Sequence, residues 1–298
     1  MHIGFVGTGN IGNRFVKKLL EARHTVTVTD LRKAAAENLL ALGARWAEWP
    51  ADVARAAGTV LASLPNPSAV ERVALDERAG VLDALPEGGV FVDMSTSPPA
   101  LARRIAAAYA AKRRVALDAP VSNGGVFTTV GGDRATFERL RPVFEVISPG
   151  RVLYMGEAGQ GQVAKLTRQY VSFVNFFTIS EAIMIAARSG ADVRAVLDFI
   201  GASTRHGDFW SRSFNSLFTG DFATPETAGA KLDIVSKDVH LALELAREAK
   251  APANIGLPVA DLLERGQAQG WGQYEYWIAV KVLEQMANHE LRPPAKRE

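Results

Sequence analysis

Three glycines near the start of the chain have the spacing of a loop that binds a dinucleotide. Residues 7–12 read G-x-G-x-x-G, with Gly7, Gly9 and Gly12 at the glycine positions. In such a loop the first glycine permits a tight turn, the second lets a pyrophosphate approach the backbone, and the third lets the following helix pack closely. Free N–H groups at the start of that helix, around Asn10 and Ile11, then face the phosphates. The pattern is weak alone, so it needs a strand before it and a helix after it, and both are predicted here.

A carboxylate and an arginine follow this loop where the ribose of a dinucleotide would lie. Asp30 stands eighteen residues after Gly12, at the end of the second predicted strand. A carboxylate there accepts hydrogen bonds from the adenosine ribose hydroxyls and repels a 2′-phosphate, which favours NAD. Arg32 could bind such a phosphate or face solvent, so NADP stays possible.

Two further loops follow predicted strands, at the edge where ligands bind in open α/β sheets. One contains Leu64, Pro65 and Asn66, and the other contains Thr96 within the sequence D-M-S-T-S-P. Either loop could instead cap a helix, because Ser and Thr before proline are good capping residues. One loop can also cap a helix and contact the cofactor at the same time.

Strands that alternate with helices must position these loops. In the first half of the chain this alternation predicts parallel β-α-β units, and right-handed crossovers then give a doubly wound sheet. After Gly150 one short run, Arg151–Met155, leads into a long apolar helix and no further convincing strand. We therefore predict a dinucleotide-binding domain over residues 1–160 and an all-helical substrate and oligomerisation domain over residues 161–298. The other predicted strands are 2–6, 25–29, 59–63, 90–93 and 115–118, and the predicted helices are 11–21, 33–42, 99–111, 163–189, 193–200, 232–249 and 277–288.

Composition excludes several classes of function. The 298 residues contain no cysteine, which rules out disulfides, thiolate catalysis and cysteine-bound zinc, and no histidine pair has the spacing of a metal site. A net charge of +2 without a clustered basic face gives no support for nucleic-acid binding. The first residues do not read as a signal peptide, and the longest apolar stretch is interrupted by polar residues, so we expect no membrane span. The lack of cysteine fits a reducing compartment, so we expect a cytoplasmic location.

Motifs spread over nearly the whole chain resemble the β-hydroxyacid dehydrogenases, which include 3-hydroxyisobutyrate dehydrogenase, tartronate semialdehyde reductase and the more distant 6-phosphogluconate dehydrogenase. The resemblance implies a Rossmann-type α/β N-terminal domain with a mainly parallel sheet, followed by an all-α C-terminal domain. It also implies hydride transfer between NAD(P) and a small hydroxy acid or its semialdehyde. Each motif alone is weak evidence for the family, but the order that they share with it makes the resemblance specific. They are the glycine loop, L-P-N at 64–66, D-M-S-T at 93–96, D-A-P-V-S at 118–122, G-G at 131–132, G-x-G at 159–161 with Lys165, and K-D at 237–238.

The resemblance also implies roles for individual residues. The family's catalytic lysine lies four residues after the G-x-G and matches Lys165. The family holds the substrate carboxylate with a serine and glycines that map onto Ser122 and its neighbours Asn123 and Gly124. Thr96 matches a threonine near the nicotinamide and substrate. Lys237 matches a lysine that approaches the cofactor.

A lysine suits this chemistry because oxidation of an alcohol must remove the O–H proton as hydride leaves carbon. At an apolar helix start, desolvation can lower the pKa of Lys165, so that its amine exchanges that proton. In the reverse direction its ammonium protonates the developing alkoxide. Without the resemblance, Lys165 would be interpreted as an ordinary surface lysine.

The chain departs from the family pattern in two places. The segment after Ser122 is about seven residues shorter than usual and begins with Asn123, so the carboxylate pocket is expected to be reshaped. An asparagine that often follows the lysine is replaced by Arg168 and Gln169. Gln169 lies one helical turn from Lys165 and could hydrogen-bond the substrate, whereas Arg168 could bind a second anionic group or point to solvent.

The sequence also leaves two alternative functions open and predicts the partners of the chain. Imine reductases share this architecture but generally lack the lysine, so Lys165 argues against imine reduction; the shortened loop keeps a non-catalytic cofactor-binding protein open. The apolar helix at 163–189 predicts a homodimer or homotetramer, and the expected partner is a small carboxylate substrate. His206, Asp208 and Trp210 form a polar and aromatic cluster on a predicted loop of the helical domain.

Overall fold

The structure is a computed structural model that describes residues 1–203, 219–220, 222, 224–228, 230–248, 250–288 and 290. Two compact units divide the chain, Met1–Val171 and Ser172–Glu298. The division falls inside one long helix, α8 (Gln160–Arg188). Each unit is described by itself below.

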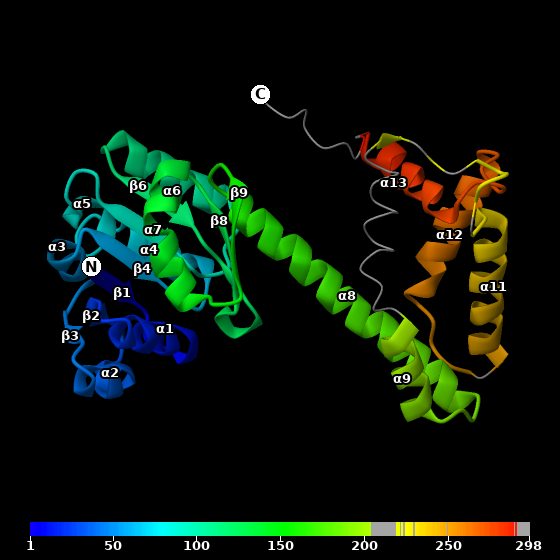
Figure 1. Cartoon of the computed structure of the whole chain (residues 1–298), viewed down its shortest axis with the longest axis horizontal. Coiled ribbons are helices and arrows are strands. Elements are labelled where there is room, and N and C mark those ends of the chain that lie inside the picture. Colours follow the sequence, from blue (N-terminus) through cyan, green and yellow to red (C-terminus); the bar gives the residue numbers. More distant parts are fainter. Residues whose placement is uncertain are drawn as a thin grey trace. The chain divides into compact units, whose positions relative to one another are not determined.

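The first unit is built on a nine-stranded sheet (Figure 1). Its strands follow the order β3-β2-β1-β4-β5-β6-β8-β7, with β9 paired to β8. The first six strands run parallel to one another, whereas β8 is antiparallel to β6 and β7 and parallel to β9. The strands are β1 (His2–Val6), β2 (Thr25–Thr29), β3 (Arg45–Trp46), β4 (Thr59–Ala62), β5 (Val90–Asp93), β6 (Val115–Asp118), β7 (Val121–Ser122), β8 (Phe127–Gly131) and β9 (Arg151–Gly156).

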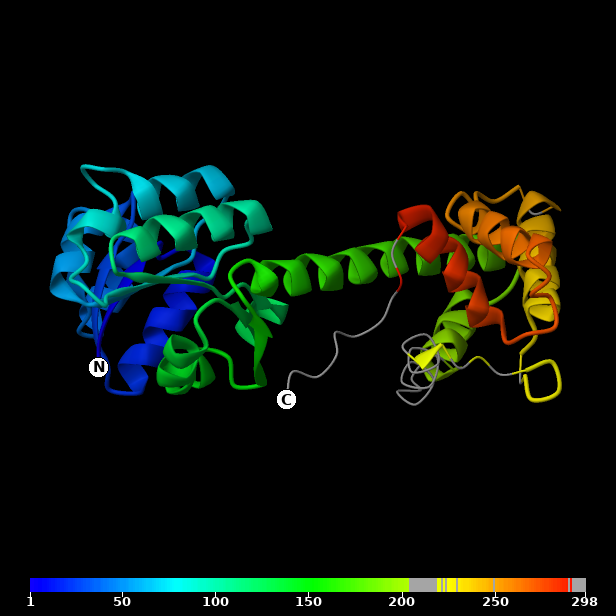
Figure 2. The ribbon, with the colours of Figure 1, turned by 90° about the horizontal axis from the view of Figure 1, so that it is seen from above.

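Helices cover both faces of this sheet, as Figure 2 shows for the first unit. One face packs against α1 (Asn10–Glu21), the short helices η1 (Lys33–Ala36) and α2 (Glu37–Ala41), and α7 (Arg134–Ile147). The other packs against α3 (Pro50–Ala56), α4 (Pro67–Leu75), α5 (Val81–Ala84) and α6 (Pro99–Ala111). The predicted doubly wound, mainly parallel α/β domain is therefore confirmed.

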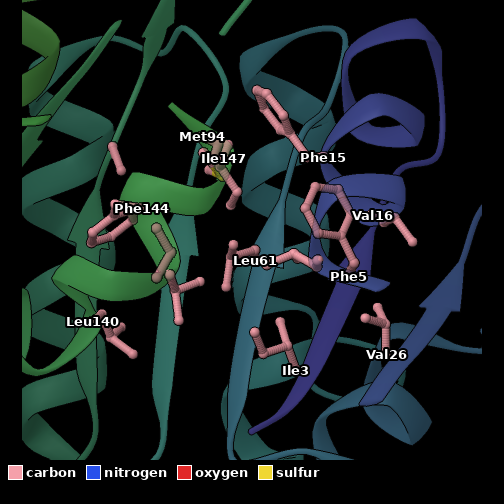
Figure 3. Packing of buried hydrophobic residues seen from close by; sticks show 14 of the residues in the cluster. Ile3, Phe5, Phe15, Val16, Val26, Leu61, Met94, Leu140, Phe144 and Ile147 are labelled. Atoms are coloured by element: carbon pink, nitrogen blue, oxygen red, sulfur yellow. The ribbon is translucent and has the colours of Figure 1, made fainter. Parts of the chain in front are cut away.

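Alternating side chains of each strand supply the two cores. Ile3 and Phe5 of β1 point to the face that carries Phe15 of α1, whereas Val6 belongs to the core with Val53 of α3 (Figure 3 shows the first of these cores). Successive strand residues point to opposite faces, so a strand covered on both sides must be apolar almost throughout. Fully burying one such side chain contributes about 1.5–3 kcal/mol to stability.

Sequence and structure differ in several strands and helices. The strands predicted at residues 2–6, 25–29, 90–93 and 115–118 have the observed bounds, but β3, β7 and β8 were not predicted. The strands β3 and β7 have only two residues each and carry no measurable alternation, which explains why these two were missed. The helices α3, α4, α5, α7 and α12 (Gly256–Ala268) were also not predicted.

The described elements of the second unit are helices, apart from one isolated β-bridge between Lys231 and Glu275. Its elements are the later part of α8, α9 (Val193–Ser203), α11 (Leu232–Glu248), α12 (Gly256–Ala268), the short 3-10 helix η3 (Tyr276–Ala279) and α13 (Val280–Ala287). Leu232, Leu263, Ile278 and Ala279 form a small core among α11, α12 and η3. Among the described helices, none is long and apolar enough to cross a membrane.

Candidate active site

The glycine loop links β1 to α1 in the way its spacing predicts. Gly7 has φ +91° and donates its N–H to the carbonyl oxygen of Thr29 over 2.9 Å. A Cβ on Gly12 would lie 1.9 Å from the carbonyl oxygen of Gly7, so α1 can approach the turn only because residue 12 has no side chain.

The loop leaves room for an anion at the start of α1. Gly9 occupies the N-cap position, no side chain caps the helix, and a Cβ on Gly9 would meet no atom within 4 Å. The first N–H groups of a helix lack intrahelical partners and attract negative charge. The open start of α1 therefore fits a pyrophosphate, and the binding of that group by the N–H groups around Asn10 and Ile11 stays a prediction.

Asp30 follows β2 and is tied to the same loop. Its Oδ2 accepts hydrogen bonds from the backbone N–H of Thr8 at 2.7 Å and from the Thr8 hydroxyl at 3.2 Å, and its Oδ1 accepts from the N–H of Arg32. The carboxylate thus fixes the second position of the loop, a role that sequence reasoning missed. Each carboxylate oxygen can accept more than one hydrogen bond, so a ribose hydroxyl can still be bound.

The loops after β4 and β5 are joined to each other. The N–H of Leu64, beside Pro65, donates to the hydroxyl of Ser95 over 2.9 Å. Asn66 caps α4 by accepting from the N–H of Ala69, so the capping alternative holds for this loop. It does not hold for the loop of Thr96, because α6 starts after Pro98 without a side-chain cap.

Asp118, at the end of β6, holds the start of α8. Its Oδ1 accepts from the N–H of Gly159 at 2.7 Å, and its Oδ2 accepts from the N–H of Gln162 at 2.8 Å. This carboxylate is buried, and burial raises its pKa against the opposing effect of these hydrogen bonds. Asp118 therefore fixes the helix that carries Lys165 to the edge of the sheet.

Lys165 and Ser122 are brought together across 43 residues. The Lys165 ammonium donates to the Ser122 hydroxyl over 3.2 Å, and the lysine residue is only 7% exposed. Its pKa is lowered, first by desolvation and second by the positive charge of Arg168. An amine with a lowered pKa loses its proton more readily, so Lys165 can exchange a proton with a bound alcohol.

The shortened segment after Ser122 forms a tight hairpin. Ser122 of β7 pairs with Phe127 of β8, and a 3-10 turn, η2 (Asn123–Gly125), joins the two strands. A Cβ on Gly125 would lie 2.4 Å from the ring of Phe15 in α1. The hairpin turn therefore packs on the helix of the glycine loop, which places the predicted substrate segment beside the predicted cofactor segment.

Other predicted residues lie further along the chain. Gln169 is half-buried on α8, one turn after Lys165. Lys237 belongs to α11 of the second unit, and its side chain lies outside the described part of the structure. His206, Asp208 and Trp210 also lie outside the described residues. Their predicted roles stay untested.

Comparison with known proteins identifies the family. Residues 2–156 match the NAD-binding domain of 6-phosphogluconate dehydrogenase, and residues 159–283 match the NAD-binding domain of NADP-dependent 3-hydroxyisobutyrate dehydrogenase. The chain belongs to the β-hydroxyacid dehydrogenase family. It is 32% identical over 292 residues to 2-(hydroxymethyl)glutarate dehydrogenase of Eubacterium barkeri, covering 95% of each chain. It is 33% identical over 306 residues to 2-hydroxy-3-oxopropionate reductase of Escherichia coli, covering 98% of this chain and all of the relative.

Solved structures agree with this assignment to the β-hydroxyacid dehydrogenases. The 3-hydroxyisobutyrate dehydrogenase of Mycobacterium tuberculosis with L-serine is 28% identical, with a TM-score of 0.65 over 95% of this chain and 98% of that chain. The V8 variant of an imine reductase of Myxococcus stipitatus in complex with NAD+ has a TM-score of 0.85 over 95% of this chain and 99% of that chain, but at 19% identity this likeness shows the fold alone. This β-hydroxyacid dehydrogenase is thus an NAD(P)-dependent oxidoreductase that acts on a CH–OH group.

Proposed function

We propose that this β-hydroxyacid dehydrogenase interconverts a short hydroxy acid and its semialdehyde, with Lys165 as general acid and base. The observation that carries the proposal is the buried Lys165 ammonium at 3.2 Å from the Ser122 hydroxyl. The helix of Lys165 starts from the same sheet edge at which the glycine loop leaves β1.

The substrate class follows from what the relatives' names have in common. A hydroxymethylglutarate, a 3-hydroxyisobutyrate and L-serine all contain a hydroxymethyl group on the carbon that carries a carboxylate. We therefore propose substrates of the form HOCH2–CHR–COO−. Ser122 and the backbone of its hairpin would bind the carboxylate, with Gln169 one turn beyond Lys165 close to the R group.

The chemistry then divides between cofactor and protein. When bound, the nicotinamide accepts a hydride from the hydroxymethyl carbon or returns it to the aldehyde. In oxidation, the neutral amine of Lys165 takes the O–H proton, and in reduction its ammonium returns a proton to the same oxygen. Asp30, the glycine loop and the loops of Leu64–Asn66 and Thr96 would hold the cofactor, and Asp30 favours NAD over NADP.

A screen of substrates against both cofactors tests the proposal. 3-Hydroxyisobutyrate, L-serine, glycerate and 2-(hydroxymethyl)glutarate would each be assayed with NAD+ and NADP+, and a cyclic imine with NADH and NADPH. We expect turnover with at least one hydroxy acid and a preference for NAD+. Turnover of the imine alone would replace the proposal by imine reduction. Absence of NAD(P) binding by calorimetry would refute the dinucleotide site.

The pH dependence of kcat/KM for oxidation should change with the charge of Arg168 beside Lys165. Oxidation needs the neutral amine, so kcat/KM for oxidation falls as the pH drops below the pKa of Lys165. Arg168 lowers that pKa, so Arg168→Ala should raise it and move the acid limb to higher pH. Arg168→Lys keeps the charge and should leave the limb in place. Equal profiles for Arg168→Ala and the wild type would contradict the assignment of Lys165 as the titrating base.

Oligomeric state and cellular location remain predictions from the sequence. Exposed apolar side chains on the first turns of α8, at Val163, Leu166 and Val171, support a homodimer or homotetramer. The cytoplasmic location rests on composition.

A further inference from the structure

A glutamine in the first turn of α8 is completely buried, and both its amide nitrogen and its amide oxygen are hydrogen-bonded. Gln162 has 0% exposure. Its Nε2 donates to the carbonyl oxygen of Ser95 over 2.9 Å, and its Oε1 accepts from the backbone N–H of Ser97 over 3.0 Å. These two residues flank Thr96, whose side chain is exposed while both neighbours are buried. One amide therefore fixes the backbone on each side of Thr96.

The backbone of Gln162 is fixed as well. Its N–H donates to the carboxylate of Asp118, which also binds the N–H of Gly159. Lys165 follows three residues later, so it lies about one turn along the same helix. Gln162 thus forms a direct link between the segment that carries Lys165 and the loop that carries Thr96.

A second carboxylate organises the same loop from the other side. Asp93, at the end of β5, accepts from the N–H of Ser95 and from the hydroxyl of Ser97, each over 2.9 Å. Asp93 pairs with Asp118 in the register of β5 and β6. With both flanks of Thr96 bound by Asp93 and Gln162, the loop has little freedom to shift relative to α8.

We propose that Gln162 is a positioning residue that sets the distance between the Thr96 loop and Lys165, and so aligns the nicotinamide site with the proton-transfer site. The inference rests on the proposed function, in which Lys165 moves the proton and the Thr96 loop lies beside the nicotinamide. With 0% exposure, Gln162 offers no surface to a substrate or cofactor. Its effect is on geometry, to which hydride transfer is sensitive, since a displacement of about 1 Å can cost a factor of ~10² in rate.

An amide is required because Ser95 presents an acceptor and Ser97 presents a donor. Alanine leaves both buried groups without a partner. Glutamate keeps the acceptor for Ser97, but in its ionised form it places an oxygen against the carbonyl of Ser95. When protonated, its carboxyl O–H donates to that carbonyl and restores the native pattern. Gln162→Glu should therefore behave like the wild type only when residue 162 is protonated.

The charges around position 162 fix the direction of this effect. Asp93 on β5 and Asp118 on β6 are buried acids close to the amide, whereas Lys165 on α8 and Arg103 on α6, which approaches Gly159, carry positive charge on the packed elements. Burial raises the pKa of Asp93 to about 6 and also raises that of Asp118. Burial raises the pKa of a carboxyl placed at position 162 in the same way; the two acids add to this effect, and the two cations oppose it.

The experiment compares wild type, Gln162→Ala, Gln162→Glu and the control Gln160→Ala in the reducing direction between pH 6 and 9. Gln160 lies half a turn earlier on the same helix with an exposed side chain. We expect Gln162→Ala to lower kcat by about 10- to 100-fold at all pH values, with KM for NADH and aldehyde within about threefold of the wild type. The kcat of Gln162→Glu divided by that of the wild type should rise as the pH falls. Gln160→Ala should match the wild type.

Amide hydrogen exchange supplies a readout that does not need turnover. Gln162→Ala should remove the exchange protection of the Ser97 amide, and Gln160→Ala should keep it. A pH-independent ratio for Gln162→Glu, or a kcat for Gln162→Ala within twofold of the wild type, would overturn the proposal. Unchanged Ser97 protection in Gln162→Ala would overturn it even if the wild type reduces none of the aldehydes, a result that would separately refute the proposed function.

Discussion

Replacing Lys165 by methionine is expected to lower kcat for the oxidation of a hydroxy acid by about 10³-fold, the middle of the range for general acid and base catalysis. Methionine keeps most of the buried lysine stem, so the packing around the 7%-exposed side chain is retained while the amine is lost. Affinity for NADH, measured by calorimetry, should change by less than about threefold because the glycine loop lies on a different element. Steady-state kinetics on the substrate found in the screen measures the loss.

Two further variants decide whether the loss reflects proton transfer. In Lys165→Ala, small primary amines added to the buffer should restore part of the activity, because they can occupy the vacated space and exchange the proton. Lys17→Met is the surface control: Lys17 is exposed and makes a 3.9 Å ion pair with Glu21, an interaction of little energetic weight. Retention of more than a tenth of wild-type kcat in Lys165→Met would remove the lysine from the mechanism.

Two alanine substitutions in the glycine loop are expected to separate cofactor binding from folding. Gly9→Ala places a methyl group in space that is open in the structure and where the pyrophosphate would lie. Its backbone, at φ −63° and ψ −173°, accepts alanine, so the free energy of unfolding without cofactor should fall by less than about 1 kcal/mol. Affinity for NADH should fall by about 10- to 100-fold, the equivalent of 1–3 kcal/mol of steric conflict.

Gly12→Ala is expected to damage both properties. Its Cβ would lie 1.9 Å from the Gly7 carbonyl oxygen and 2.9 Å from the ring of Phe5, so the start of α1 must shift. Such overpacking costs about 1–3 kcal/mol of stability, and the displaced N–H groups should also bind NADH more weakly. Urea unfolding without cofactor and calorimetry with NADH measure the two effects. If Gly9→Ala binds NADH as the wild type does, the pyrophosphate does not lie over this loop.

The sequence by itself determined the parts of this protein that depend on local order. The run His2–Val6, the loop at 7–12 and the helix that follows predict one strand-loop-helix unit, because each step is encoded by neighbouring residues. Alternation of such units predicts the parallel sheet, and the spaced motifs predict the β-hydroxyacid dehydrogenase family, which the comparisons confirm. Lys165 was found through that resemblance, and its catalytic role stays a prediction.

Only the tertiary structure decided how the strand-end loops are held together. Asp118 binds N–H groups 41 and 44 residues away, and Gln162 reaches Ser97 and Ser95 across 65 and 67 residues. Local patterns cannot pair such groups, because a buried donor takes its acceptor from whichever element the fold brings near. Asp118, the acid at the end of β6, could have been recognised from the sequence, since a carboxylate at the end of an apolar strand needs hydrogen-bond partners once it is buried.

The shortened segment after Ser122 likewise combines a feature that the sequence predicted with features that only the structure shows. The sequence predicted a reshaped loop, but the hairpin of β7 and β8 and its packing on Phe15 follow from contacts with a helix more than a hundred residues earlier. Order along the chain therefore determined which loops belong to the site. Burial and hydrogen bonding between distant elements decided that Ser122, Lys165 and the loop of Thr96 are held at one edge of the sheet.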